Sequence, residues 1–158
     1  MLGSGARVVR SLLFDKSPDA NWDVPWHQDT TIAVESQADV PGFGPWSIKE
    51  NVPHVRPPSH VLASMLAVRI NLDANTQTNG PLLVAPGSHK RGINSDNLDS
   101  AIFESSKVAC TTHAGGAVLM RPLLFHASRK ATTPTHRRVL HLECSASHLS
   151  PPLQWSPG

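Results

Sequence analysis

Proline and glycine interrupt this chain so often that long helices are excluded from most of it. It has 14 Pro and 10 Gly in 158 residues, and the apolar runs between them are short. Both residue types mark turns rather than the interior of an element, because proline lacks a backbone donor and glycine lacks conformational restraint. The pattern predicts an all-β fold of short strands and turns, with one or two short helices.

Seven segments have the alternation or composition of β-strands and end at turn residues. They are residues 7–14, 26–34, 65–73, 81–85, 108–112, 117–126 and 137–144. Ser95 is suited to cap a helix over residues 96–105. Residues 35–58 are rich in turn-forming residues and are expected to form a long loop folded over a site. Short strands with such joints predict a closed or double-sheet β fold.

Length and composition limit the class of protein. A chain of 158 residues with 39% hydrophobic and 16% charged residues fits one folded domain, residues 1–158. A net charge of +2 with scattered basic residues argues against a nucleic-acid surface. No apolar run suggests a membrane span or a signal peptide. Two cysteines without zinc-site spacing fit free thiols, so a cytoplasmic location is expected.

The segment 65–73 has one apolar and one polar face. Leu66, Val68 and Ile70 alternate with Arg69 and Asn71. A strand of this kind usually turns its apolar face to the core and its polar face to water. A barrel with a polar interior offers the reverse arrangement, in which Arg69 and Asn71 point inward.

A candidate metal site comes from two separate segments. His27 and Asp29 form an H-x-D pair, and residues i and i+2 of a strand point to the same side. His126 ends the expected strand 117–126. Two imidazoles and one carboxylate leave coordination positions open and are typical of non-haem Fe(II) oxygenases. An H-x-D pair alone is a weak signal, because His27 would also fit an ordinary half-buried histidine.

Arg137 strengthens the hypothesis. It lies eleven residues after His126, at the start of another expected strand. Its guanidinium can bind a carboxylate through two parallel hydrogen bonds, and Ser128 could add a hydroxyl donor. A co-substrate with a distal carboxylate needs such groups near the metal.

With these residues in place, the chain resembles the phytanoyl-CoA dioxygenase family of Fe(II)- and 2-oxoglutarate-dependent oxygenases, especially its uncharacterised bacterial members. The resemblance covers about residues 14–144. Its matching segments are Trp26–Asp29 (WHQD), Asn79–Leu82 (NGPL), Pro86–His89 (PGSH), Gly116–Ser128 (GAVLMRPLLFHAS) and then Arg137.

The resemblance implies a double-stranded β-helix, a jelly-roll or cupin-like barrel. It implies His27, Asp29 and His126 as Fe(II) ligands, Arg137 and Ser128 as holders of 2-oxoglutarate, and Gln28 near that co-substrate. Its members also use O2. The carboxylate of Asp29 favours hydroxylation over halogenation, with desaturation and ring closure left open.

Two features depart from the family pattern. Arg69 stands where relatives often carry Trp near the co-substrate. Arg69 would bind a carboxylate of 2-oxoglutarate or of the substrate, or it would be a surface arginine. Few residues precede the first expected strand, whereas relatives usually have additional N-terminal helices, so the domain is minimal or further residues support it.

Substrate contacts are the least defined part of the prediction. Trp46 and His54 lie in the expected loop 35–58, where they would close over substrate or form a separate apolar cluster. His141 shares the face of Arg137 and would contact substrate or stay a satisfied barrel residue. Asn71 is a further candidate if its strand face points inward.

The sequence thus predicts an Fe(II)- and 2-oxoglutarate-dependent dioxygenase that hydroxylates a small organic substrate and releases succinate and CO2. The alternative is a non-oxidative metal-binding barrel acting as a hydrolase, isomerase or small-molecule sensor. A barrel that has lost catalysis and serves as an interaction module is a third hypothesis. The substrate, the pathway and the oligomeric state, including a homo-oligomer, stay open.

Overall fold

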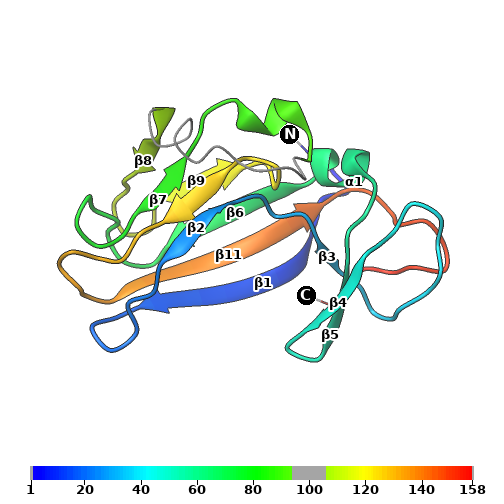
Figure 1. Ribbon diagram of the computed structural model, residues 1–158, viewed down its shortest axis with the longest axis horizontal. Helices are drawn as coiled ribbons and strands as arrows, with labels where there is room; N and C mark the ends of the chain where they lie inside the picture. The colour runs from blue at the N-terminus through cyan, green and yellow to red at the C-terminus, as the bar shows by residue number, and fades with distance from the viewer. Residues whose placement is uncertain (1, 94–105, 158) are drawn as a thin grey trace.

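The computed structural model describes residues 2–93 and 106–157 and has an almost entirely antiparallel β architecture (Figure 1). One four-stranded sheet has the order β1-β11-β6-β9, and a second has the order β2-β10-β7-β8. Their bounds are Arg7–Lys16 (β1), Arg137–Ser145 (β11), Leu66–Asn71 (β6), Ala117–Met120 (β9), Val24–His27 (β2), His126–Ser128 (β10), Leu82–Val84 (β7) and Val108–Cys110 (β8). The two sheets form the walls of a double-stranded β-helix, as the resemblance implies.

A third, smaller sheet has the order β3-β5-β4, and its β4–β5 hairpin lies within the segment expected to be a loop. Its strands are Ile32–Ala33 (β3), Trp46–Lys49 (β4) and Val52–Val55 (β5). Glu50 and Asn51 join β4 to β5 with φ values of 51° and 65°. Two consecutive positive φ angles are typical of the type I′ turn that matches hairpin twist, and asparagine tolerates this conformation well. The prediction of an irregular loop was therefore wrong for residues 46–55, whereas residues 35–45 and 56–58 contain neither helix nor strand.

Two further element predictions need correction. The expected strand 26–34 is broken after His27, and Asp29 follows the strand end, where its backbone N–H donates to the Pro122 carbonyl. The expected strand 117–126 is two strands in different sheets, separated by a turn closed by the Leu124 N–H to the Arg121 carbonyl. Apolar residues continue through the second break, at residues 122–125, so the pattern did not reveal it; the first break lies in the polar residues 28–31.

Short helices occur where the sequence showed no periodic signal. A one-and-a-half-turn helix, α1, spans Ser59–Ser64, and a 3-10 helix, η1, spans Ser88–Arg91. Helix α1 buries Val61 and Leu62. The helix expected over residues 96–105 lies outside the described residues. No described helix is long and apolar enough to cross a membrane.

The largest hydrophobic cluster lies at the α1 and β3–β5 end of the molecule. It includes Ile32, Val34, Val55, Leu62 and Met65, all nearly inaccessible to solvent. The space between the two large sheets is lined instead by many polar side chains. Apolar packing at one end thus holds the barrel together while the interior remains available for polar groups.

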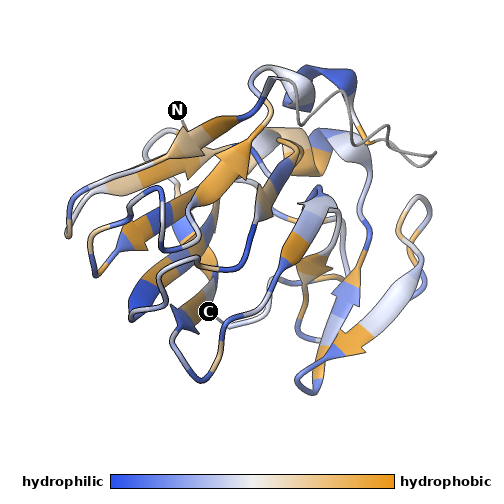
Figure 2. Cartoon of the chain, turned by 60° about the vertical axis from the view of Figure 1, so that its left-hand side comes forward, coloured by the Kyte–Doolittle hydropathy of each residue, from blue (hydrophilic) through white to orange (hydrophobic). Residues whose placement is uncertain are grey.

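Strand β6 turns its polar face inward. Arg69 and Asn71 are 8% and 2% exposed, whereas the alternate positions Val68 and Ile70 are only half-buried. Figure 2 shows this alternation of hydrophilic and hydrophobic segments along the strands. The usual arrangement, with the apolar face toward the core, does not hold here because the barrel interior is polar.

Candidate metal and co-substrate site

A cavity of about 330 Å³ lies between the two four-stranded sheets. The wall formed by β1, β11 and β6 carries the charged or titratable residues Arg10, Lys16, Arg69, Arg137, His141 and Glu143. The wall formed by β2 and β10 carries His27, His126 and Ser128, with Asp29 following β2. The volume is within the ordinary range for a small-molecule site.

His27, Asp29 and His126 meet at one place on the cavity wall. Register pairing sets His27 opposite His126 across β2 and β10. The two Nε2 atoms lie 3.8 Å and 3.7 Å from the Asp29 carboxylate oxygens, and the three potential ligand atoms lie within 4.8 Å of one another. Three ligand atoms that are each about 2.1 Å from one metal lie roughly 3.0–3.6 Å apart, so a divalent metal fits this group once the side chains close in by about 1 Å.

Backbone carbonyls orient both imidazoles for metal binding. His27 Nδ1 donates to the Pro25 carbonyl at 2.8 Å, and His126 Nδ1 donates to the Leu124 carbonyl at 2.9 Å. A carbonyl only accepts, so the ring proton lies on Nδ1 and the Nε2 lone pair is left for a metal. Burial lowers the pKa of His126, which favours the neutral form that ligates metal.

Arg137 is a buried cation with unused donors. Its side chain is 2% exposed, and its Nε and Nη1 atoms have no hydrogen-bond acceptor among the described residues. Burial lowers its pKa to about 10, with a further lowering from the charge of Arg69. An unpaired buried guanidinium is costly in the free protein, so a bound carboxylate would relieve that cost.

Lys16 lies directly opposite Arg137 in the β1–β11 register and is 1% exposed. Its Nζ donates to Ser128 Oγ at 2.8 Å, to the Ser128 carbonyl at 3.3 Å and to the Arg129 carbonyl at 2.6 Å. Burial lowers the pKa of Lys16 to about 8, assisted by the Arg137 charge. Two positive groups therefore occupy the same end of the cavity.

Ser128 lines the cavity beside this pair, although its hydroxyl is already committed. Ser128 Oγ accepts from Lys16 and donates to the Gly80 carbonyl at 3.0 Å. Its role in the free protein is therefore to connect Lys16 to the Gly80 turn.

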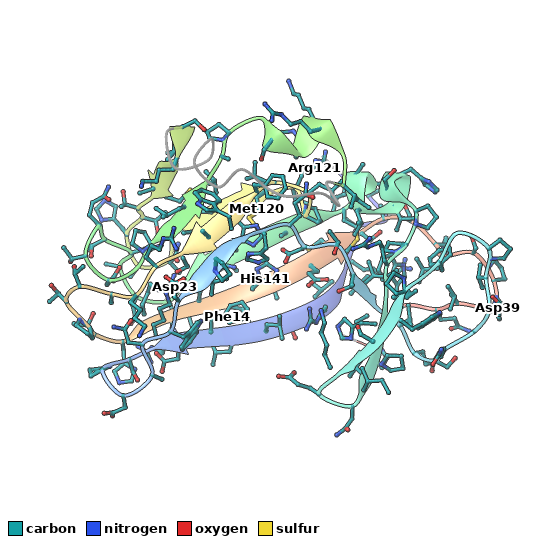
Figure 3. The ribbon with its side chains drawn as sticks, viewed as in Figure 1. Phe14, Asp23, Asp39, Met120, Arg121 and His141 are labelled. Carbon is teal, nitrogen blue, oxygen red and sulfur yellow. The ribbon has the colours of Figure 1, made fainter. Side chains whose placement is uncertain are left out.

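Arg69 and His141 form a second polar group on the same wall, facing the metal cluster from the other sheet. Arg69 Nη1 donates to His141 Nδ1 at 3.1 Å, and the His141 ring packs edge-on against Phe14 with centroids 5.9 Å apart (Figure 3). Burial, and then the charge of Arg69, lower the pKa of His141 to about 4. The imidazole is therefore neutral at physiological pH.

Four of the expected site residues lie outside the cavity lining. Gln28 Nε2 donates to the Gly92 and Leu123 carbonyls, both at 2.8 Å, and Asn71 donates to Thr112 Oγ1 at 2.6 Å. Trp46 packs against the large hydrophobic cluster. His54 lines a second cavity of about 130 Å³, with Nδ1 directed at the Val52 carbonyl.

Among the charged cavity residues on β1 and β11, three were not identified from the sequence: Lys16, Arg10 and Glu143. Arg10 and Glu143 form an ion pair at 3.0 Å across β1 and β11. All three lie on the inward face of amphipathic strands, where charged residues are usually read as solvent-facing. The sequence shows that these side chains alternate along the strand with Ser11 and Leu13, which are more exposed. It does not show which of the two faces points into the barrel.

The fold and site together define a double-stranded β-helix with a two-histidine, one-carboxylate group that could hold a metal, and a basic pocket beside it. The family model described as phytanoyl-CoA dioxygenase (PhyH) matches residues 5–139. The chain belongs to the phytanoyl-CoA dioxygenase family.

Solved structures share the fold. EctD from S. alaskensis with bound Fe is 24% identical with a TM-score of 0.64, covering 92% of this chain and 47% of that chain. EctD with 2-oxoglutarate and 5-hydroxyectoine is 25% identical with a TM-score of 0.62, covering 89% of this chain and 44% of that chain. SnoK, a non-heme alpha ketoglutarate dependent carbocyclase from nogalamycin biosynthesis, is 18% identical with a TM-score of 0.62. The match covers 97% of this chain and 53% of that chain.

This chain spans about half the length of these proteins or less. Among curated proteins, none matches its sequence closely enough to be identified as a relative.

Proposed function

We propose that this chain is an Fe(II)- and 2-oxoglutarate-dependent dioxygenase that hydroxylates a small organic substrate. The observation that carries the proposal is the presence, in one cavity, of the His27–Asp29–His126 group and of Arg137 with two unpaired guanidinium nitrogens. Family membership supports the same reading. The EctD structures with Fe and with 2-oxoglutarate are consistent with it.

In this proposal His27, Asp29 and His126 hold Fe(II) through two Nε2 atoms and one carboxylate. Arg137 binds the distal carboxylate of 2-oxoglutarate, and Lys16 adds a second positive charge at that end. When bound, Fe(II) with 2-oxoglutarate and O2 supplies the oxidising power, and succinate and CO2 are released. Three open coordination positions are what a chelating co-substrate and O2 require.

The protein's own contribution is position and exclusion of water. The Pro25 and Leu124 carbonyls hold the two imidazoles in the ligating tautomer. Leu12 and Phe14 line the cavity wall that faces the metal group and reduce the water in the cavity. Cys110 and Cys144 are free thiols, which supports a cytoplasmic location.

The test is a spectrum recorded without oxygen after adding Fe(II) and 2-oxoglutarate. The proposal expects the weak visible charge-transfer band of chelated 2-oxoglutarate, followed by succinate formation when O2 and a substrate are supplied. His126→Ala should abolish the band, and Arg137→Gln should require far more 2-oxoglutarate to produce it. A folded wild-type protein with no band and no succinate under any condition would favour the non-oxidative metal-binding alternative.

A further inference from the structure

Arg69 is the buried cation that the proposed function leaves without a partner. It lies on β6, in register with His141, lines the cavity and is 8% exposed. Within the described residues it has no carboxylate within 4 Å. Its hydrogen-bond partner in the structure is the neutral ring of His141, at 3.1 Å.

The other neighbour of Arg69 is aromatic. The guanidinium carbon lies 5.5 Å from the centroid of the Phe14 ring, a distance suited to a cation–π contact. Such a contact and one neutral acceptor compensate only part of the cost of burying a full positive charge. A buried arginine in this situation is suited to receive an anionic group from a ligand.

The charge balance of the loaded cavity leads to the same residue. Four cationic side chains, Arg10, Lys16, Arg69 and Arg137, face three carboxylates, those of Asp29, Glu50 and Glu143. A divalent metal and a dianionic co-substrate add no net charge. Arg10 is paired with Glu143, Arg137 has the co-substrate, and Lys16 is bonded to three oxygens. One positive charge is left in excess. Lys16 and Arg69 both lack a carboxylate of their own, and Arg69 has the fewer acceptors, a single neutral imidazole at 3.1 Å.

Besides His141, the charge of the Asp29 carboxylate acts on Arg69 across the cavity, and the nearest residues on β1 are apolar. Leu12 stands opposite His141 in the β1–β11 register, and Phe14 follows two residues later on the same face. A ligand anion on Arg69 would thus be attached to an apolar skeleton, with the metal group on the facing wall.

We propose that Arg69 binds a carboxylate of the substrate, so that the substrate class is a small carboxylic acid with an apolar body. This inference rests on the proposed function and extends it by naming the residue that selects the substrate. The carboxylate lies on Arg69, and the apolar body lies against Leu12 and Phe14, within reach of the metal group. The other source of a carboxylate at this position is the metal-chelating end of 2-oxoglutarate.

The experiment compares acids with their uncharged amides. Phenylacetate and hexanoate are titrated against phenylacetamide and hexanamide by calorimetry, using the full chain with Fe(II) and 2-oxoglutarate under anaerobic conditions. In the wild type the acids should bind at least about tenfold more tightly than the amides, the effect of one hydrogen-bonded charge pair. Acids that bind no better than amides would overturn the proposal.

Variants separate the two sources of carboxylate. Arg69→Gln should remove the acid preference while the Fe(II)–2-oxoglutarate band forms at unchanged 2-oxoglutarate concentration, and Arg69→Lys should keep part of the preference. Arg138→Gln, an exposed arginine on the same sheet, is the matched control and should change neither. If Arg69→Gln is folded and loses the band, Arg69 belongs to the co-substrate and the proposal fails.

Calorimetry keeps this test independent of the proposed function. If the wild type shows no band but still prefers acids through Arg69, the oxygenase assignment fails and the carboxylate subsite stands.

Discussion

Lys16 and Arg137 are register partners at the end of the β1–β11 pair, and both side chains are almost fully buried. In the part of the chain that the structure describes, no carboxylate pairs with either one. Two adjacent buried cations destabilise the free protein and favour any anion that enters between the sheets. This relationship links the stability of the fold to the proposed binding of 2-oxoglutarate.

Replacing Arg137 should therefore have opposite effects on stability and on binding. Arg137→Met removes a buried charge with two unsatisfied nitrogens, so the free energy of unfolding of the ligand-free protein should rise by about 1–3 kcal/mol. Stabilisation by added 2-oxoglutarate should disappear. Urea denaturation with and without the co-substrate measures both effects.

The adjacent Arg138 provides the comparison for this prediction. It lies on the exposed face and holds Asp73 through two bonds, at 2.9 Å and 2.7 Å. Arg138→Met should lower stability slightly and leave the response to 2-oxoglutarate unchanged. A destabilised Arg137→Met protein would contradict the account of an uncompensated charge.

Lys16 predicts a specific dependence of stability on pH. Its pKa is about 8 in the folded protein, below the ordinary value of 10.5. Between these values the unfolded chain binds more protons, so the free energy of unfolding should increase as pH rises through this window. The difference between wild type and Lys16→Met in denaturant titrations at pH 7 to 10.5 isolates this contribution. A difference that is flat across the window would show that Lys16 keeps an ordinary pKa.

Asp29 should determine metal affinity because its carboxylate lies between the two imidazoles. Asp29→Ala is expected to weaken Fe(II) or Mn(II) binding by more than the roughly 10–100-fold that loss of a residue supporting a ligand typically costs. Metal-induced thermal stabilisation, measured anaerobically, should vanish with it. Asp39 is an exposed residue at the far end of the molecule in Figure 3, so Asp39→Ala should leave the metal-induced thermal stabilisation unchanged.

Gly80 is a point of close approach in the Lys16–Ser128 region. It has φ +74°, and a Cβ there would lie 2.6 Å from the Arg129 carbonyl oxygen and 3.2 Å from Lys16 Nζ. Gly80→Ala should cost about 2–4 kcal/mol, since strain at positive φ adds to a backbone clash. Gly87→Ala has φ +80° with open space around it, so it should cost only about 1 kcal/mol. Equal costs in chemical denaturation would refute the clash.

The sequence by itself determined the β class and the residue types available for chemistry. Pro and Gly punctuation excluded long helices in most of the chain, and the strands over residues 7–14 and 137–144 correspond closely to β1 and β11. The sequence also showed the candidate group His27, Asp29, His126 and Arg137, because metal and carboxylate binding depend on residue type and spacing. Their roles as ligands and co-substrate contacts stay proposals.

The tertiary structure decided which face of each strand points inward and where the apolar run over residues 117–126 is interrupted. Alternation along β6 is the same whether Arg69 faces water or the barrel interior, and only pairing with β11 and β9 distinguishes these cases. The hairpin of β4 and β5 likewise combines a local turn at Glu50 and Asn51 with pairing of β5 to β3. Lys16 became part of the site for the same reason, since its partners Ser128 and Arg129 are more than a hundred residues away in the chain.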